Sequence, residues 1–127
     1  MNLEKIVYGF FIVLALTLNF GFFIGEIDNP THHHVWEFAF VLVVNLIATI
    51  LKLGDRSQMD AMLLATSLVA MIQLVAAALI WIIGVHILAA GMTPELMSSI
   101  VSLSGGAMLA NVVSVVLLVV ETVMVRR

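Results

Sequence analysis

Four long apolar runs that carry almost no charge constrain this chain more than any other feature. They cover residues 6–25, 35–52, 61–86 and 96–121, and any charged residues in them lie near their ends. About 20 apolar residues cross the hydrocarbon core of a bilayer as an α-helix. Thr93 followed by Pro94 predicts the start of the last helix. We therefore expect an all-α polytopic membrane protein, a single transmembrane domain over 1–127 with four helices in an up-down bundle.

The composition supports this class and excludes others. Of the 127 residues, 63% are hydrophobic and 10% are charged, and a soluble chain of this size could not bury that much apolar surface. The four spans leave no room for a catalytic, nucleotide-binding or nucleic-acid-binding domain. The sequence contains no cysteine, which excludes disulfides and thiolate metal sites. It also lacks a Ser-His-Asp arrangement and a phosphate-binding glycine loop, so we expect no enzyme activity.

The basic residues predict the orientation. They lie at the two ends of the chain and in the middle loop, and the other two loops have none: Lys5, Lys52, Arg56, Arg126 and Arg127. Because cytoplasmic loops are enriched in Lys and Arg, we expect both termini in the cytoplasm. The first span is too long for a signal peptide and lacks a cleavage site, so we expect it to be retained.

Acidic and imidazole side chains gather in the two predicted outer loops. Carboxylates around a pore mouth would attract cations, and the candidates are Glu26, Asp28, Glu37 and Glu95. Imidazole beside carboxylate suits a divalent metal such as Zn²⁺, and histidines also titrate near neutral pH. The candidates for metal binding or pH sensing are His32, His33, His34 and His86. The alternative is a solvated, hydrogen-bonded loop without a metal.

Each predicted span contains one side-chain amide, and hydroxyl or acidic groups share its helical face. The candidates for polar stripes or a pore lining are Asn19, Asn45, Thr49, Gln73, Asn111, Ser114 and Glu121. Two interpretations remain open. The amides could hydrogen-bond to one another across the core of the bundle, or they could line a path for ions or water.

Small residues recur at every fourth position in two spans, which lets helix backbones approach closely. They are Thr17, Gly21 and Gly25 in the first span, and Ser98, Ser102, Gly106 and Ala110 in the fourth. This packing could lie within one bundle or between subunits.

Four stretches carry a resemblance that spans nearly the whole chain: NFGFFIGEIDNPTHH, NLIATILKLGDRS, LATSLVA and SLSGGAMLANVVS. They resemble a family of small bacterial four-helix inner-membrane proteins of unknown function. The resemblance implies a bacterial origin, a location in the bacterial inner (cell) membrane and a multi-pass fold, and it implies nothing about activity.

These observations lead to two functional hypotheses. The first is a homo-oligomeric membrane protein that conducts or transports small cations, with the acidic and histidine-rich loops at its outer mouth. Because a bundle of four short helices has a filled core, we expect the path to lie between several copies. The alternative is a non-conducting accessory or assembly subunit of a larger membrane complex. The expected partners are the lipid bilayer, further copies of the chain and small cations, with no nucleic acid.

Overall fold

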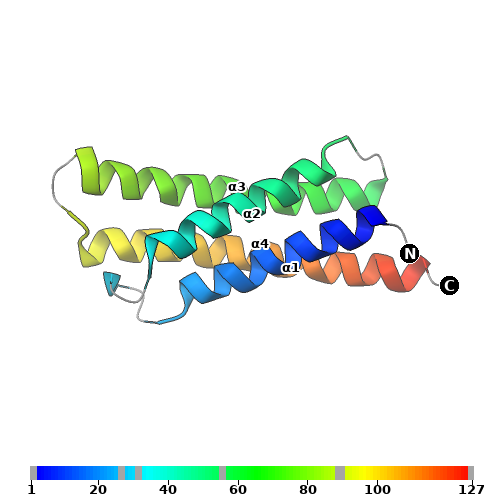
Figure 1. Cartoon of the computed structure of the whole chain (residues 1–127), viewed down its shortest axis with the longest axis horizontal. Helices are drawn as coiled ribbons and strands as arrows, with labels where there is room; N and C mark the ends of the chain where they lie inside the picture. The colour runs from blue at the N-terminus through cyan, green and yellow to red at the C-terminus, as the bar shows by residue number, and fades with distance from the viewer. Residues whose placement is uncertain (1–2, 26–27, 31–32, 55–56, 88–90, 126–127) are drawn as a thin grey trace.

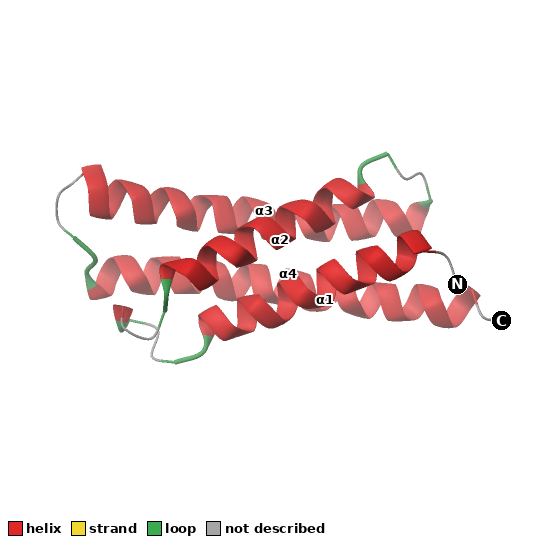
Figure 2. Ribbon diagram, in the orientation of Figure 1, coloured by secondary structure: helices red, strands yellow, loops and turns green. Residues whose placement is uncertain are grey.

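The chain folds into four long helices (Figure 2). The computed structural model describes residues 3–25, 28–30, 33–54, 57–87 and 91–125, and within these ranges no residue lies in a β-strand. The helices are α1 (Leu3–Phe23), α2 (Val35–Lys52), α3 (Gln58–Ile82) and α4 (Pro94–Val125). A short π-helical segment, η2 (Ile83–Ile87), continues α3. The predicted all-helical architecture is confirmed.

The helices form an up-down bundle in which each runs antiparallel to the next (Figure 1). α1 packs against α2 and α4, and α3 packs against the same two helices. Both termini lie at one end of the bundle, which we call the terminal end, together with the connection between α2 and α3. The other two connections lie at the opposite end, which we call the distal end.

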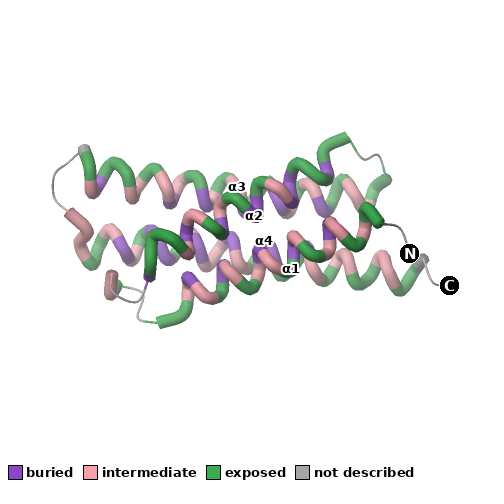
Figure 3. Tube along the Cα trace, viewed as in Figure 1, coloured by how far each residue is buried: buried purple, intermediate pink, exposed green. Residues whose placement is uncertain are grey.

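The outside of the bundle is apolar. Large side chains such as Trp36, Phe10 and Ile72 are 75%, 62% and 68% exposed, and exposed positions follow the outer faces of all four helices (Figure 3). All four helices are long and apolar enough to cross a membrane. Soluble proteins rarely expose apolar surfaces of this extent to water. The exposed apolar faces and the helix lengths are therefore those of a multi-pass membrane protein.

Local signals set the helix ends. α3 begins after Ser57, whose hydroxyl accepts a hydrogen bond from the Asp60 backbone N–H at 3.0 Å. Thr93 caps α4 in the same way through the Leu96 N–H at 3.2 Å, which confirms the predicted start. α1 ends at Phe23, two residues before the predicted boundary, and Gly25 follows with a φ of +110° that favours glycine.

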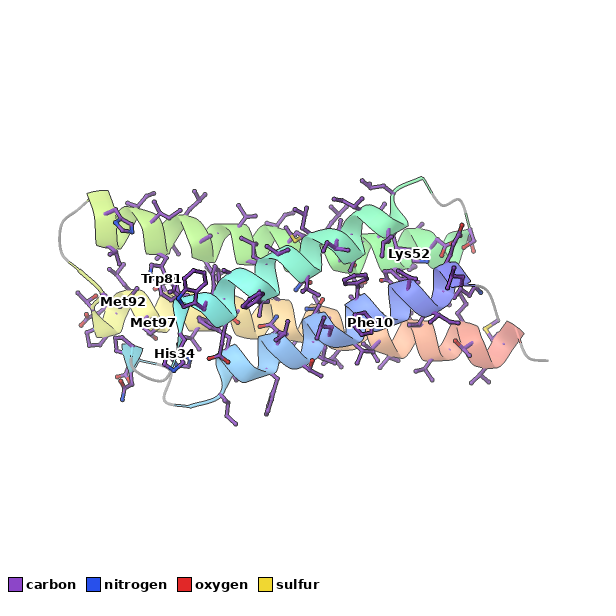
Figure 4. The ribbon with its side chains drawn as sticks, viewed as in Figure 1. Phe10, His34, Lys52, Trp81, Met92 and Met97 are labelled. Carbon is purple, nitrogen blue, oxygen red and sulfur yellow. The ribbon has the colours of Figure 1, made fainter. Side chains whose placement is uncertain are left out.

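The core differs between the two ends. Toward the distal end, Phe22, Phe38 and Trp81 form an aromatic cluster whose ring centroids lie 5.2 to 6.1 Å apart. Figure 4 shows Trp81 and Met97 on this side and Lys52 near the opposite end. Toward the terminal end, the apolar cluster is smaller and contains Tyr8, Ile12, Ala48 and Leu63. Polar side chains occupy much of the remaining interior there.

Candidate functional site

A buried ion pair connects α2 and α3 at the terminal end of the bundle. Lys52, the last residue of α2, is 5% exposed, and its Nζ donates to Asp60 Oδ1 of α3 at 2.9 Å. The same ammonium lies 4.4 Å from the centre of the Tyr8 ring of α1, which is a cation–π contact. Ser57 donates to the second carboxylate oxygen of Asp60 at 2.7 Å. One charged group thus joins α1, α2 and α3.

A second ion pair joins α1 to α4 at this end. Lys5 Nζ lies 3.6 Å from Glu121 Oε1, and the side chains are 36% and 13% exposed. The predicted polar residue Glu121 therefore pairs with the N-terminal turn of α1. The 3.6 Å separation is an ionic contact and is too long for a good hydrogen bond.

The middle of the bundle contains buried polar atoms from all four helices. Within the described part of the chain, no hydrogen-bond partner meets Tyr8 Oη, Asn45 Oδ1, Ser67 Oγ, Gln73 Oε1 or either amide atom of Asn111. We call these five residues the polar layer. Asn45, Ser67 and Asn111 are 0% exposed. An orphaned buried polar group costs about 1–3 kcal/mol, so a cluster of them requires an explanation.

The register between α2 and α3 places Asn45 and Ser67 at the same level along the bundle axis. Asn45 precedes Lys52 by seven residues, and Ser67 follows Asp60 by seven residues. Because α2 and α3 are antiparallel and the ion pair fixes their register, both residues lie about 10 Å from it along the helix axes.

Two contacts between α3 and α4 place the remaining members. The Thr66 and Ser114 hydroxyls are hydrogen-bonded to each other. One to two turns toward the distal end, Gln73 Nε2 lies 2.5 Å from the position that a Cβ on Gly106 would occupy. Asn111 falls between Gly106 and Ser114 on α4, as Ser67 falls between Thr66 and Gln73 on α3. The polar layer therefore occupies about two helical turns near the middle of the bundle.

The side-chain amides do not bond to one another. Asn45 Nδ2 donates to Val41 O of its own helix at 3.0 Å. Asn19 reaches across to α4, where its amide lies 2.7 Å from the Ser104 hydroxyl. Among the described residues, no recorded hydrogen bond joins two of the amides of Asn19, Asn45, Gln73 and Asn111. The interpretation of an amide network across the core therefore gains no support from the structure.

The candidates Thr49 and Ser114 each donate to the backbone of their own helix, in addition to the contact between Ser114 and Thr66. Thr49 Oγ1 donates to the Asn45 carbonyl oxygen at 2.8 Å, and Ser114 Oγ donates to Ala110 O at 3.3 Å. Both hydroxyls thus return to the preceding turn of their own helix, as threonine and serine often do in apolar surroundings.

The structure brings together part of the predicted acidic mouth. Asp28 and Glu95 line an open pocket of about 360 Å³ at the distal end, together with Pro94 and Ser98. Glu37 instead lies against α1, with Oε2 at 3.3 Å from the position that a Cβ on Gly21 would occupy. Glu26 lies outside the described residues. The pocket holds two exposed acids, and Glu37 belongs to the contact between α1 and α2.

The predicted histidine candidates are dispersed. His33 is 2% exposed, and its Nδ1 donates to the Phe22 carbonyl oxygen while its ring lies 5.4 Å from the Phe22 ring. His34 precedes α2 and His86 lies in η2, and both are exposed. His32 lies outside the described residues, among which no three His, Cys, Asp or Glu side chains group as metal ligands. His33 therefore ties the loop before α2 to the end of α1.

The small residues divide between the inside and the outside of the bundle. Gly106 makes room for Gln73, and Gly105 makes room for Phe23, whose Cε1 lies 2.7 Å from the position of an added Cβ. Gly21, Ser98 and Ala110 are half-buried, whereas Thr17 and Ser102 are exposed. Packing within one bundle thus accounts for Gly21 and Gly106.

Sequence reasoning did not single out Tyr8, Ser67 or Asp60. Tyr8 is the one tyrosine of the chain, and its place within an apolar run was the available signal. Ser67 follows Thr66 in a span with few polar residues. Their role depends on which residues face them from other helices, which a single-helix pattern does not contain.

Comparison with known proteins identifies the family of the chain. No curated protein and no solved structure matches the chain. Residues 32–122 match a family described as a family of unknown function (DUF6394), and this match includes α2, α3 and most of α4. Since the match covers more than half of the chain, the protein belongs to this family of unknown function.

Proposed function

We propose that this protein conducts or transports small cations across the bacterial inner membrane through the interior of its own bundle. The observation that carries the proposal is the polar layer, a set of buried oxygens from all four helices that meet no hydrogen bond of normal geometry in the described part of the chain. Amide and hydroxyl oxygens can replace the hydration shell of a hard cation. In lipid, no water replaces a missing partner, so such groups lower the stability of the bundle when they are left without one.

The distribution of charge supports an orientation with both termini in the cytoplasm. Lys5 and Lys52 lie at the terminal end of the bundle, where both chain ends also lie (Figure 1). Asp28, which precedes α2, and Glu95, in the first turn of α4, lie at the distal end. This asymmetry agrees with the enrichment of Lys and Arg on the cytoplasmic side of membrane proteins.

The proposed path has a closed gate in the distal half. The aromatic cluster of Phe22, Phe38 and Trp81 lies between the acidic pocket and the polar layer. Apolar constrictions stop ions by excluding water. Cation movement in this proposal therefore requires a displacement of these rings, with Asp28 and Glu95 gathering cations outside them.

The sequence-based hypothesis had the cation path between several copies of the chain. The position of the amides favours a path inside the bundle of a single copy. Asn45 and Asn111 are 0% exposed in a single bundle, so they face the interior. Homo-oligomerisation stays part of the proposal as a separate element. The exposed small residues Thr17 and Ser102 would allow close approach of another copy, and the mass of the protein in mild detergent measures it.

Cation flux into liposomes tests the proposal. Liposomes containing the purified protein should take up Na⁺ or K⁺ at least tenfold faster than protein-free liposomes. Asn111→Leu should remove most of this flux, because it deletes a fully buried amide whose oxygen and nitrogen both lack a hydrogen-bond partner in the described part of the chain. Leu109→Ala is the matched control on the same helix, because Leu109 is 64% exposed on the outside.

Two results would contradict the proposal. One is a parent protein that gives no flux of cations or protons, and the other is an equal loss of flux in Leu109→Ala. A silent protein that keeps an unrelated membrane protein bound in mild detergent would support the alternative function, an accessory or assembly subunit.

A further inference from the structure

We infer that the polar layer is a binding site for one monovalent alkali-metal cation, with side-chain oxygens of Asn45, Ser67 and Asn111 as its main ligands. The inference rests on the proposed function and names its substrate class. In this inference the ion binds to these three side chains within the bundle, and a divalent ion is excluded.

The Asn45 amide has a fixed orientation that directs its oxygen away from its own helix backbone. Its Nδ2 donates to Val41 O at 3.0 Å. A carbonyl oxygen only accepts, so the nitrogen must face Val41 and Oδ1 must take the other position. Within the described chain this 0% exposed oxygen meets no donor. It therefore offers two lone pairs to a cation inside the bundle.

Ser67 supplies a hydroxyl oxygen at the same height. Its side chain lies against the Tyr8 hydroxyl, although the two do not form a hydrogen bond of normal geometry. A hydroxyl hydrogen can rotate and leave a lone pair available to a ligand. Tyr8 thus provides a second hydroxyl on the terminal side of the site.

Asn111 contributes from α4 with the least constrained amide of the layer. Neither its oxygen nor its nitrogen has a hydrogen-bond partner among the described residues, and its side chain is 0% exposed. The next polar residue on this face, Ser114, bonds to Thr66 and to Ala110 O. Ser114 therefore fixes the register of α3 and α4, and Asn111 remains available as a ligand.

The neutral character of the layer selects a monovalent ion. Its oxygens belong to amides and hydroxyls. The charged groups that act on Tyr8 are Lys52, Asp60 and Glu121; Lys52 pairs with Asp60 at 2.9 Å, and Glu121 pairs with Lys5 at 3.6 Å. The cost of desolvating an ion rises with the square of its charge, so a divalent ion would need carboxylate ligands. The layer also lacks imidazole and thiolate, the ligands that transition metals prefer.

Binding to the purified chain in detergent tests the inference. The probes are ²²Na⁺ and ⁸⁶Rb⁺, with choline keeping the ionic strength constant. We expect saturable binding of one ion per chain and a melting temperature several degrees higher in the alkali salt than in choline chloride. Asn111→Leu and Asn45→Leu should each weaken binding at least tenfold, and Leu109→Ala should bind like the parent.

The outcomes separate this inference from the proposed function. Absence of saturable binding in the parent would overturn the inference, as would binding that both Asn variants retain, or Ca²⁺ displacing ²²Na⁺ at equal ionic strength. Binding without flux would keep the cation site and remove conduction. Flux without saturable binding would keep conduction and remove the site. Circular dichroism verifies that each variant retains its helices, and if either Asn variant unfolds, Asn111→Ser replaces it.

Discussion

The distal and terminal halves of this bundle are built by the same four helices but have opposite interiors. In the distal half, Phe22, Phe38 and Trp81 pack with Met97 and Ile100 into a continuous apolar cluster. The terminal half contains the buried Lys52–Asp60 pair and the partly exposed Lys5–Glu121 pair, and the polar layer lies between these pairs and the middle of the bundle. The difference indicates that close apolar packing concentrates in one half and buried polar groups in the other.

The difference between the two interiors matters because the solvent around the bundle is lipid. Apolar side chains gain little by leaving a solvent that is as apolar as they are, so helix association depends on close packing and on polar contacts. The aromatic rings of the distal half supply close packing. The polar layer supplies buried dipoles without partners, which weakens the bundle. We expect substitutions of buried residues to lower the free energy of unfolding in the distal half and to raise it in the polar layer.

The largest effect is expected for Phe22→Ala in the distal half. Phe22 is 0% exposed and its ring lies near those of Phe38, Trp81 and His33. Removal of the ring should lower the free energy of unfolding by about 3 kcal/mol, the low end for a buried phenylalanine, because lipid removes most of the transfer component. Unfolding in mixed detergent micelles with increasing dodecyl sulfate measures it.

Phe10→Ala is the matched control. Phe10 is 62% exposed on the outer face of the same helix, so its replacement should change the free energy of unfolding by less than about 0.5 kcal/mol. Equal losses for the two variants would show that the distal half is not closely packed.

A smaller loss is expected for Asp60→Asn in the terminal half. The substitution leaves the Lys52 ammonium, which is 5% exposed, without the carboxylate at 2.9 Å. We expect a loss of about 2 kcal/mol, below the range for fully buried pairs because Asp60 is 20% exposed. The same unfolding assay measures the loss.

The double variant Lys52→Met/Asp60→Leu sharpens this result. Because it removes both charges together, it should recover most of the lost stability. A double variant as unstable as Asp60→Asn would indicate that the packing of the side chains, and not their charge, stabilises this end.

The sequence predicted the helices far better than the partners of their side chains. Thr93 was predicted to start the last helix because capping is a local signal, and it does. Lys52 was predicted to lie at the cytoplasmic end of its span because of its charge. Its position inside the bundle between Tyr8 and Asp60 depends on the register of three helices. His33 was predicted as a metal or pH candidate, whereas its bond to the Phe22 carbonyl is a tertiary contact.

The smallest expected effect, and the one with the opposite sign, is that of Asn111→Leu. Its two amide atoms meet no hydrogen-bond partner in the described chain and are fully buried. Replacement by an apolar side chain of similar size should stabilise the bundle by about 1 kcal/mol, because the desolvation cost of both groups that it removes is partly offset by the poorer fit of a leucine in a site shaped for an amide. The same unfolding assay measures the gain, with Leu109→Ala as the control.

This gain would coincide with the loss of flux and of cation binding that the proposals predict for Asn111→Leu. A residue that lowers stability while it supports activity is retained for its activity, which is the expected trade-off at a functional site. If Asn111→Leu instead lowers the free energy of unfolding by more than about 1 kcal/mol, the amide has a stabilising partner. The polar layer would then belong to the packing of the terminal half, and the two halves would differ only in the kind of contact that stabilises them.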